Sequence, residues 1–458
     1  MAMLQNDTIA AIATPYAVGS IGIIRLSGEK AKNIVSSIFV PVGERNLYNV
    51  NGFSGVFGKI VDGENVIDEA VVFVYNSPRS YTGEDIVEIS CHGGLYITKR
   101  ILRLCYDKGA RPAQGGEFTK RALLNGKLSL TQAEAVMDII SANGEQSAKA
   151  AISAKDGAIY TEIKEIEKIL ISASGHLAAW VDYPEEDIEE IGYASLEKDL
   201  RFVKEKLQKL IKSYDVGQIV KNGVKTVIVG KPNVGKSTLM NMLSGTEKSI
   251  VTEIAGTTRD VVEDVIYVGD VVLNIADTAG IRETDDPVES AGVLLANKRL
   301  ENSYLILAVF DGSKELTKDD IELLEKLQGK QVIGIINKSD LGKNIDIELI
   351  KSKIKHIVDV SAMRGDGKQQ LIDCVNSVLS LNQVSFSDAV VANERQRACV
   401  MKAIENVEEA LNAVLMQITL DAVNVCIDFA IDSLLELTGE KACEAVVNEV
   451  FSKFCVGK

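Results

Sequence analysis

Residues 230–237 read Gly-Lys-Pro-Asn-Val-Gly-Lys-Ser and lie between the apolar run 226–229 and a helix-like segment at 238–243. The two glycines let the backbone curl so that successive N–H groups point into one concavity, which binds phosphate oxygens. Lys236 then reaches the outer phosphates, and the Ser237 hydroxyl binds a magnesium ion. A strand before the loop and a helix after it are the context that this motif requires. We therefore interpret residues 230–237 as a phosphate-binding loop.

Strand-like and helix-like segments alternate around this loop. The strand-like apolar runs lie at 226–230, 271–276, 305–311, 331–337 and 356–361. Such alternation favours a mostly parallel sheet with helices on both faces, and phosphate loops lie at the carboxyl ends of such strands. We expect residues 217–380 to form a Ras-like P-loop domain with a doubly wound sheet.

Helical periodicity flanks this P-loop domain on both sides. It covers residues 133–213 before the domain, and residues 394–415 and 422–454 after it. We infer that the two flanks pack together. They would form one discontinuous all-α domain from residues 122–216 and 381–458, with the P-loop domain inserted into it.

The first part of the chain has a different pattern. Residues 1–121 contain short β-rich segments at 8–13, 21–26, 70–75 and 86–90, separated by Gly-rich turns. This pattern predicts an α+β domain. The expected fold class is therefore multidomain α/β.

Composition is that of an ordinary soluble globular protein, with 458 residues, 46% hydrophobic and 25% charged. No apolar run approaches the ~20 residues that span a bilayer. The first ten residues lack the basic and apolar segments of a secretory signal. We therefore expect a cytoplasmic protein without membrane contact. Seven scattered cysteines without CxxC spacing argue against a disulfide framework and a zinc site.

The net charge of −15 is unexpected for a protein that binds nucleic acid by itself. The charge is unevenly distributed, because residues 1–122 carry 13 basic and 12 acidic side chains, whereas residues 380–458 carry 6 and 12. Any contact with RNA must therefore depend on local basic patches or on a second protein.

The segment Asn337-Lys338-Ser339-Asp340 follows the strand expected at 331–337 and indicates which base is bound. A carboxylate at Asp340 accepts two hydrogen bonds from guanine, and adenine cannot supply that pair of donors. GTP is therefore the expected nucleotide. The dipeptide Ser361-Ala362 after the next strand fits the remaining element on the guanine side.

Asp277-Thr278-Ala279-Gly280 fits the element beside the γ-phosphate. Asp277 would hold the magnesium shell, and Gly280 would let its N–H approach the phosphate. The next residue, Ile281, stands where Ras-type GTPases have the glutamine that orients the attacking water. Another group must orient that water, and the candidates are Arg282, Glu283, Asp285, Asp286 and Glu289.

The first switch is expected at residues 250–260, where a threonine hydroxyl should complete the magnesium shell. The sequence fixes no obvious arginine finger. Asn233 in the phosphate loop is neutral and carries an oxygen, so it can help bind a monovalent cation against the phosphates. A bound potassium ion would then supply the charge that an arginine finger otherwise provides.

Over its whole length the chain resembles the tRNA-modifying GTPases of the MnmE (TrmE) family. Besides the nucleotide motifs, the resemblance rests on residues 7–9, 21–28, 81–85, 92–94, 116–121, 124–128 and 455–458. Gly115 is a small departure, since members often carry proline there, and it implies only a looser turn.

The resemblance implies that residues 1–121 form a dimerisation domain that binds 5-formyl-tetrahydrofolate or a related one-carbon tetrahydrofolate. The positions that match the folate contacts are Arg25, Glu88, Lys127 and Lys458. These residue types suit such a ligand, because a pterin offers N–H donors to a carboxylate and a glutamate tail offers carboxylates to Arg or Lys.

The resemblance also assigns roles in the GTPase site. It implies potassium binding by Asn233, Thr252, Ile254 and Thr257, magnesium binding by Ser237 and Thr258, and water orientation by Glu289. The full set of expected GTP-binding residues is Asn233, Val234, Gly235, Lys236, Ser237, Thr238, Thr252, Thr257, Thr258, Asp277, Thr278, Ala279, Gly280, Asn337, Lys338, Asp340, Ser361 and Ala362.

Cys455 lies in the segment 455–458, and the resemblance implies that it takes part in uridine modification, as a nucleophile or in another role. The implied partner is MnmG, an FAD protein that forms a hetero-oligomer with the homodimer and supplies most of the positive surface for tRNA. Such a partner would explain how an acidic chain acts on RNA.

The sequence thus predicts a potassium-activated GTP hydrolase that, with MnmG, modifies C5 of the wobble uridine of tRNA. The added group is of the aminomethyl or carboxymethylaminomethyl type, built from a folate one-carbon unit. The alternative is a GTP-controlled switch for docking or ribosome assembly without modification chemistry. The folate-like domain and the segment with Cys455 favour the first reading, because a docking switch requires neither.

Overall fold

The computed structural model describes residues 7–44, 46–182, 193–244, 264–269, 271–275, 300, 303–379, 389–452 and 454–458. The chain forms two compact units. Unit 1 contains Met1–Met137, Ala154–Leu207 and Ala398–Lys458, and unit 2 contains Asp138–Ser153 and Gln208–Arg397. Unit 1 therefore joins early and late segments of the chain, and unit 2 holds the phosphate loop.

The first sheet of unit 1 has seven strands in the order β3-β4-β5-β6-β2-β1-β7. They are β1 (Ile9–Ile12), β2 (Ile21–Ser27), β3 (Phe39–Pro41), β4 (Ser54–Asp62), β5 (Asn65–Tyr75), β6 (Ile86–His92) and β7 (Arg111–Pro112). All neighbours are antiparallel except β1 and β7. The α+β prediction is confirmed. Strands β3, β4 and β7 were not predicted, because β3 and β7 are very short and β4 contains two glycines.

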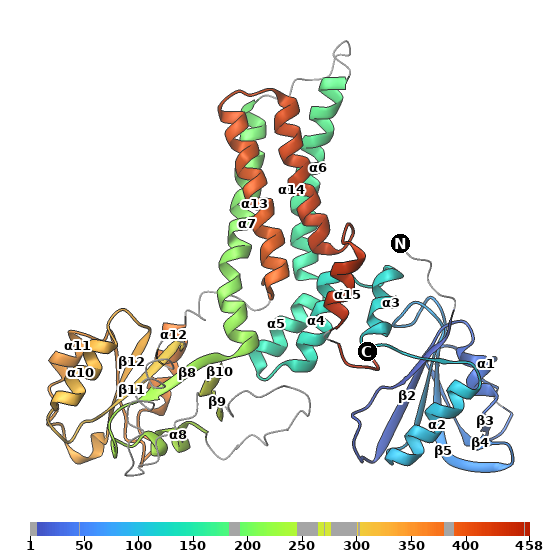
Figure 1. Cartoon of the computed structure of the whole chain (residues 1–458), viewed down its shortest axis with the longest axis horizontal. Coiled ribbons are helices and arrows are strands. Elements are labelled where there is room, and N and C mark those ends of the chain that lie inside the picture. The colour runs from blue at the N-terminus through green and yellow to red at the C-terminus, as the bar shows by residue number, and fades with distance from the viewer. Residues whose placement is uncertain are drawn as a thin grey trace, which may run out of the picture. The chain divides into compact units, whose positions relative to one another are not determined.

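One face of this sheet packs against helices. Helices α1 (Ala31–Ser36) and α2 (Leu95–Asp107) cover it (Figure 1), and Ile24, Val72 and Ile89 are fully buried there. Because side chains alternate along a strand, the residues between them point to the other face.

That other face of the sheet is open within unit 1. It carries large apolar side chains, of which Ile21 is 60%, Phe57 50% and Phe73 38% exposed. Pairing of Phe73 with Glu88, and of Glu88 with Arg25, places two charged residues on the same face. An apolar surface of this kind, next to partly buried charges, is typical of an interaction or ligand site.

The helical part of unit 1 contains α3 (Glu117–Leu124), α4 (Leu130–Ser141), α6 (Ala158–Asp182), α14 (Leu420–Thr438) and α15 (Glu444–Ser452). Helices α6 and α14 lie side by side (Figure 1). Their contact has a helical spacing, with Ile163, Leu170 and Leu177 buried seven residues apart on α6. The predicted packing of early and late helical segments is therefore observed.

The helical segment expected at 422–454 is divided into α14 and α15. Gly439 ends α14 with a φ of 93°, a left-handed conformation that favours glycine. A Cβ at this position would lie 2.6 Å from Cβ of Leu130, so the close approach of α4 also requires glycine. The segment of helical periodicity at 422–454 thus forms two helices with a glycine turn between them.

Four of the described helices have residues in both units, and α4 is one of them, since its residues 138–141 belong to unit 2. Helix α5 (Glu145–Lys155) lies mainly in unit 2, and α7 (Tyr193–Asn222) and α13 (Glu394–Leu415) each have one end in each unit. Tyr214 on α7 donates a hydrogen bond of 2.7 Å to Glu394, so the two helix ends in unit 2 are tied together.

Unit 2 is built on a six-stranded sheet in the order β13-β12-β11-β8-β10-β9. The strands are β8 (Val224–Val229), β9 (Asp264–Val268), β10 (Val271–Ile275), β11 (Leu305–Asp311), β12 (Val332–Asn337) and β13 (His356–Asp359). All neighbours are parallel except β9 and β10. The five predicted strands are confirmed, and β9 is an additional antiparallel edge strand.

Both faces of this sheet are covered, which confirms the doubly wound arrangement. One core combines strand residues such as Leu307 with α8 (Lys236–Ser244) and α12 (Lys368–Val378). The other combines the neighbouring strand residue Phe310 with α10 (Lys318–Lys326) and α11 (Ile347–Lys351). Strands buried on both faces explain the continuous apolar runs in the sequence. None of the described helices has an apolar stretch sufficient to span a membrane.

Candidate functional site

The phosphate loop joins β8 to α8, as the sequence predicts. Gly230 has a φ of 146° and Gly235 a φ of 97°, values that residues with a side chain rarely adopt. A Cβ on Gly230 would lie 2.3 Å from the carbonyl oxygen of Val309, and one on Gly235 would lie 2.2 Å from Nδ2 of Asn337. The loop therefore needs glycine at both positions for space as well as for conformation.

Lys236 lies across the loop that it follows. Its ammonium donates to the carbonyl of Gly230 at 2.6 Å and to that of Lys231 at 2.8 Å. Burial lowers the pKa of Lys236 below its ordinary value. A half-buried positive charge held on the phosphate loop attracts an anion, which is what binding of phosphates requires.

Asn337 and Lys338 connect the phosphate loop to the guanine side of the site. Asn337 donates from Nδ2 to the carbonyl of Val234 at 2.8 Å, and its Oδ1 accepts from the N–H of Ala362 at 3.0 Å. Lys338 donates to the carbonyl of Asn233 at 2.9 Å and to Asp311 at 2.6 Å. Predicted residues from three separate segments are thus joined in one hydrogen-bonded group.

Asp340 belongs to the same hydrogen-bonded group through its carboxylate. Its Oδ1 accepts from the Ser361 hydroxyl at 2.7 Å, and that hydrogen bond lowers the pKa of Asp340. The backbone N–H of Ser339 donates to Val360 at 3.2 Å, so the turn with Asp340 is fixed to the segment before Ser361. The arrangement presents an ionised carboxylate, as recognition of guanine requires.

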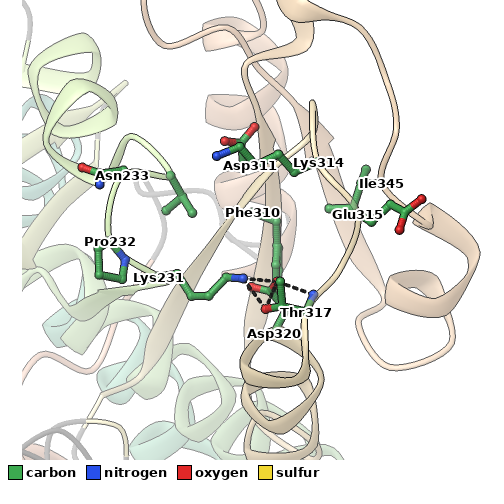
Figure 2. Close-up of a pocket in the computed structure, with 11 residues that line it drawn as sticks. Lys231, Pro232, Asn233, Phe310, Asp311, Lys314, Glu315, Thr317, Asp320 and Ile345 are labelled. Carbon is green, nitrogen blue, oxygen red and sulfur yellow. Dashed lines mark hydrogen bonds and ion pairs between the residues drawn. The ribbon is translucent and has the colours of Figure 1, made fainter.

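A pocket of about 220 Å³ lies beside the phosphate loop, on the side of α10 (Figure 2). Lys231 crosses toward α10, where it forms an ion pair of 2.7 Å with Asp320 and a hydrogen bond with Thr317 (Figure 2). Asn233 lines the same pocket and has a φ of 64°. This contact of Lys231 is not apparent from the sequence, because its partner lies about 90 positions away in the chain.

Several predicted residues of the GTPase site lie outside the described residues. They are Thr252, Ile254, Thr257, Thr258, Asp277, Thr278, Ala279, Gly280, Ile281, Arg282, Glu283, Asp285, Asp286 and Glu289. Ser237 and Thr238 lie in the first turn of α8. The described part of the site therefore comprises the phosphate loop and the guanine side.

A second site lies in the first domain of unit 1. It is a pocket of about 520 Å³ that brings together all four predicted folate positions, Arg25, Glu88, Lys127 and Lys458. The other lining residues are Phe53, Tyr75, Arg79, Ser80, Tyr81 and Ile86. Four residues that are far apart in the sequence converge on one cavity with aromatic, basic and acidic walls.

Arg25 is at the centre of this pocket. Its Nε forms an ion pair of 2.7 Å with Glu88, and another guanidinium nitrogen donates to the carbonyl of Gly457 at 3.3 Å. Tyr75 donates to the second oxygen of Glu88 at 3.3 Å, and burial and the negative charge of Glu88 raise the pKa of that phenol. The pocket thus contains a carboxylate with hydrogen-bonding partners and an adjacent cation.

One wall of the pocket is held by α3 and the residues that follow it. Tyr81 is hydrogen-bonded to Thr119 at 2.9 Å, Asn125 donates to the carbonyl of Thr82 at 2.6 Å, and Lys127 donates to that of Pro78 at 3.0 Å. These contacts explain physically why the segments 81–85 and 116–128 occur together in one chain.

Arg121 on α3 anchors this wall from behind. Its side chain is only 7% exposed and contacts three carboxylates, those of Asp7, Glu84 and Glu117. Arg111 pairs with Asp7 and Glu117 from a more exposed position, at 35%. This network is not apparent from the sequence, since charge alone does not show which residues are buried.

The segment 455–458 runs along the start of α3. The N–H of Gly116 donates to the carbonyl of Cys455 at 3.2 Å, and the N–H of Phe118 donates to the main-chain oxygen of Lys458 at 3.1 Å. Gly457 has a φ of 99°, and a Cβ there would lie 2.4 Å from the carbonyl oxygen of Ile12. The Cys455 side chain is exposed, while Lys458 lines the pocket.

Comparison with known proteins gives a consistent result. A model described as the MnmE helical domain matches residues 130–455, and one described as the GTP-binding protein TrmE N-terminus matches residues 8–127. The chain is 41% identical over its full length to all of a protein from Acetivibrio thermocellus named tRNA modification GTPase MnmE. It is 40% identical, again over both full lengths, to a Clostridioides difficile protein of the same name.

Among solved structures, a variant of Era from Aquifex aeolicus bound to GDP·AlF4⁻ is 30% identical to this chain. The match covers 40% of this chain and 66% of that one, with a TM-score of 0.27.

Proposed function

The chain belongs to the MnmE family of tRNA modification GTPases, and from this premise we propose that it hydrolyses GTP to drive modification of the wobble uridine of tRNA. The observation that carries the proposal is the convergence of Arg25, Glu88, Lys127 and Lys458 on one pocket. A switch that only docks needs no such cavity. The modification would add an aminomethyl-type group at C5 of the uridine.

GTP is the nucleotide of unit 2 in this proposal. Support comes from the glycine cradle at 230 and 235, the half-buried ammonium of Lys236 and the ionised carboxylate of Asp340. Magnesium would be held by Ser237 at the start of α8 together with Thr258 and Asp277, and it would stabilise the charge of the phosphates during transfer. Glu289 would orient the attacking water.

Potassium is the second metal ion of the proposal. Asn233 would hold it with Thr252, Ile254 and Thr257, and the ion would supply the positive charge of an arginine finger. Asn233 fits this role. It lines the pocket beside the phosphate loop, and its backbone carbonyl accepts a hydrogen bond from Lys338.

A one-carbon tetrahydrofolate would occupy the pocket of unit 1 and supply the carbon of the modification. Its size suits a drug-sized ligand, and its walls match the chemistry of the ligand. Glu88 would accept N–H groups of the pterin, Tyr75 and Phe53 would pack against its ring, and the basic side chains would bind the carboxylates of the glutamate tail.

The homodimer and the partnership with MnmG complete the proposal. The open sheet face with Ile21, Phe57 and Phe73 is the surface that a second copy would cover. It also carries Arg25 and Glu88, so dimerisation would place the folate pocket at or beside the interface. MnmG would contribute the basic surface for tRNA that this acidic chain lacks.

The test is mass analysis of wobble nucleosides in tRNA from cells with and without this chain. Modified uridine should disappear without the chain and return with the wild-type protein. We predict that Cys455→Ser retains GTP hydrolysis and fails to restore modification, whereas Cys443→Ser, which changes the other exposed cysteine, restores it. Unchanged nucleosides in cells that lack the chain would favour the docking switch.

A further inference from the structure

Asp340 has a second charged neighbour, Arg364. The Nε of Arg364 lies 3.7 Å from Oδ2 of Asp340, and the Arg364 side chain is 64% exposed whereas that of Asp340 is 12% exposed. The other oxygen, Oδ1, accepts the Ser361 hydroxyl at 2.7 Å. Both oxygens of the carboxylate therefore have a partner before any base is bound.

The backbone keeps Arg364 near Asp340. The N–H of Arg364 donates to the carbonyl of Ser361 at 3.1 Å, within the turn that follows β13. Ser361 is itself buried and paired with Asp340. The side chain of Arg364 is therefore tethered close to the carboxylate, while its exposure leaves it free to rotate away.

Guanine needs both oxygens of such a carboxylate, one for its ring N–H and one for its exocyclic amino group. A hydroxyl leaves Oδ1 with a free lone pair, since an ionised carboxylate accepts about four hydrogen bonds. The guanidinium beside Oδ2 is a charged partner that stabilises the carboxylate before a base binds, so the base has to replace that interaction. The ion pair and the base compete for the same oxygen.

We propose that Arg364 is an internal competitor of guanine at Asp340, which lowers the affinity of the site for guanine nucleotides. The inference rests on the proposed function, in which Asp340 reads the base. On binding, Arg364 moves into solvent and guanine takes its place. The exposed ion pair is weak, so the site stays accessible while the affinity is reduced by a small factor.

The experiment measures GDP binding to the full chain by calorimetry. Arg364→Gln should lower the Kd for GDP roughly two- to fivefold, the range expected for loss of an exposed ion pair. Loss of a positive charge alone would instead weaken binding of an anionic nucleotide. Lys343→Gln is the matched control, because it removes a cation from the exposed Lys343–Asp359 pair of the same unit and should not tighten binding.

IDP provides a second readout that a merely structural role would not change. Inosine lacks the 2-amino group, so it leaves one oxygen of Asp340 to Arg364 and competes less. Arg364→Gln should therefore increase the preference for GDP over IDP. An unchanged or higher Kd for GDP in Arg364→Gln would overturn the competition.

Asp340→Asn separates this inference from the proposed function. If Asp340→Asn loses affinity for GDP and Arg364→Gln does not gain it, the competition by Arg364 is refuted, whereas recognition of guanine by Asp340 is supported. If Asp340→Asn binds GDP with wild-type affinity, both the competition by Arg364 and the recognition of guanine by Asp340 are refuted, because the carboxylate would then not contact the base.

Discussion

At the scale of single residues, Asn233 combines a fixed backbone with an available side chain. Its carbonyl accepts from Lys338, and its φ of 64° is one that asparagine tolerates better than most residues. Its side chain is exposed and lines the pocket beside the loop. An exposed oxygen on a fixed backbone is what a cation ligand requires.

We predict that GTP hydrolysis is at least about tenfold faster in potassium than in sodium, since a cation at the phosphates stabilises developing charge. Asn233→Ala should remove most of this difference and leave the Kd for GDP nearly unchanged. Phosphate release in the two salts measures both effects. Asn222→Ala, at the end of α7, serves as the control with wild-type behaviour. Equal rates in both salts for the wild-type chain would contradict the role of potassium.

Much of the nucleotide site could be predicted from residue types, because the phosphate loop and the segment 337–340 have fixed spacings with a physical reason. The contacts of Lys231 with α10 and of Arg364 with Asp340 could not. Each depends on how loops from different strands come together, which the local sequence does not determine. The positions predicted to contact folate came only from the family resemblance, since Arg25 and Glu88 alone look like ordinary strand charges.

At the scale of elements, α3 links the pocket wall to the segment with Cys455. Backbone N–H groups at its start donate to residues 455–458, and Thr119 in its first half is hydrogen-bonded to Tyr81. Arg121 lies on its inner face and contacts Glu84. The helix has only eight residues, so tertiary contacts rather than intrinsic propensity must stabilise it. Among these contacts, the buried Arg121 side chain has the most partners, since it contacts three carboxylates.

We predict that Arg121→Met destabilises unit 1 by about 3 kcal/mol, because it leaves partly buried carboxylates without their cation. Arg111→Met, at a more exposed position in the same network, should lose about 1 kcal/mol. Urea unfolding followed by alkylation of the buried Cys105 reports on this unit. Equal losses in the two variants would show that burial does not set the strength of the network.

The same network has a pH dependence with a defined sign. Burial alone would raise the pKa of Asp7 and Glu117, but the hydrogen bonds from the arginines outweigh it and lower both values below 3.8 and 4.5. Their contribution to stability is therefore present above pH 4.5 and is lost as the pH falls through the lowered values. The difference between the wild type and Arg121→Met should shrink over that acidic range.

Element boundaries show where sequence patterns suffice. The strand Leu305–Asp311 and the helix Glu394–Leu415 match their predictions residue for residue, because long apolar or periodic runs leave little choice. The break at Gly439 was missed because its cause is the approach of Leu130 from another helix. Strand β4 was missed because its glycines weaken the alternating pattern, while pairing with β5 stabilises it in the sheet.

At the scale of the whole molecule, the open sheet face predicts the assembly state. Phe57 is half exposed there and does not line the pocket that contains Arg25 and Glu88. We predict that Phe57→Glu converts a dimer to a monomer, because a charge cannot be buried in an apolar interface without a partner. Sedimentation measures the change, and Phe202→Glu, an aromatic of similar exposure on α7, should remain dimeric. A dimeric Phe57→Glu would place the interface elsewhere.

The three-segment composition of unit 1 has a consequence for biosynthesis. The sheet with Arg25 and Glu88 emerges from the ribosome first, whereas Ala398–Lys458 follows only after all of unit 2 has been made. Translation proceeds at about 5–20 residues per second, so the segment that Arg25 contacts is made on the order of 20 to 80 seconds after the sheet. During that interval the Gly116 and Phe118 N–H groups have no Cys455 or Lys458 to bind. A chain interrupted before residue 455 would keep its phosphate loop and lack the part of the unit 1 pocket that Lys458 lines, so translation order itself separates completion of the phosphate loop from completion of that pocket.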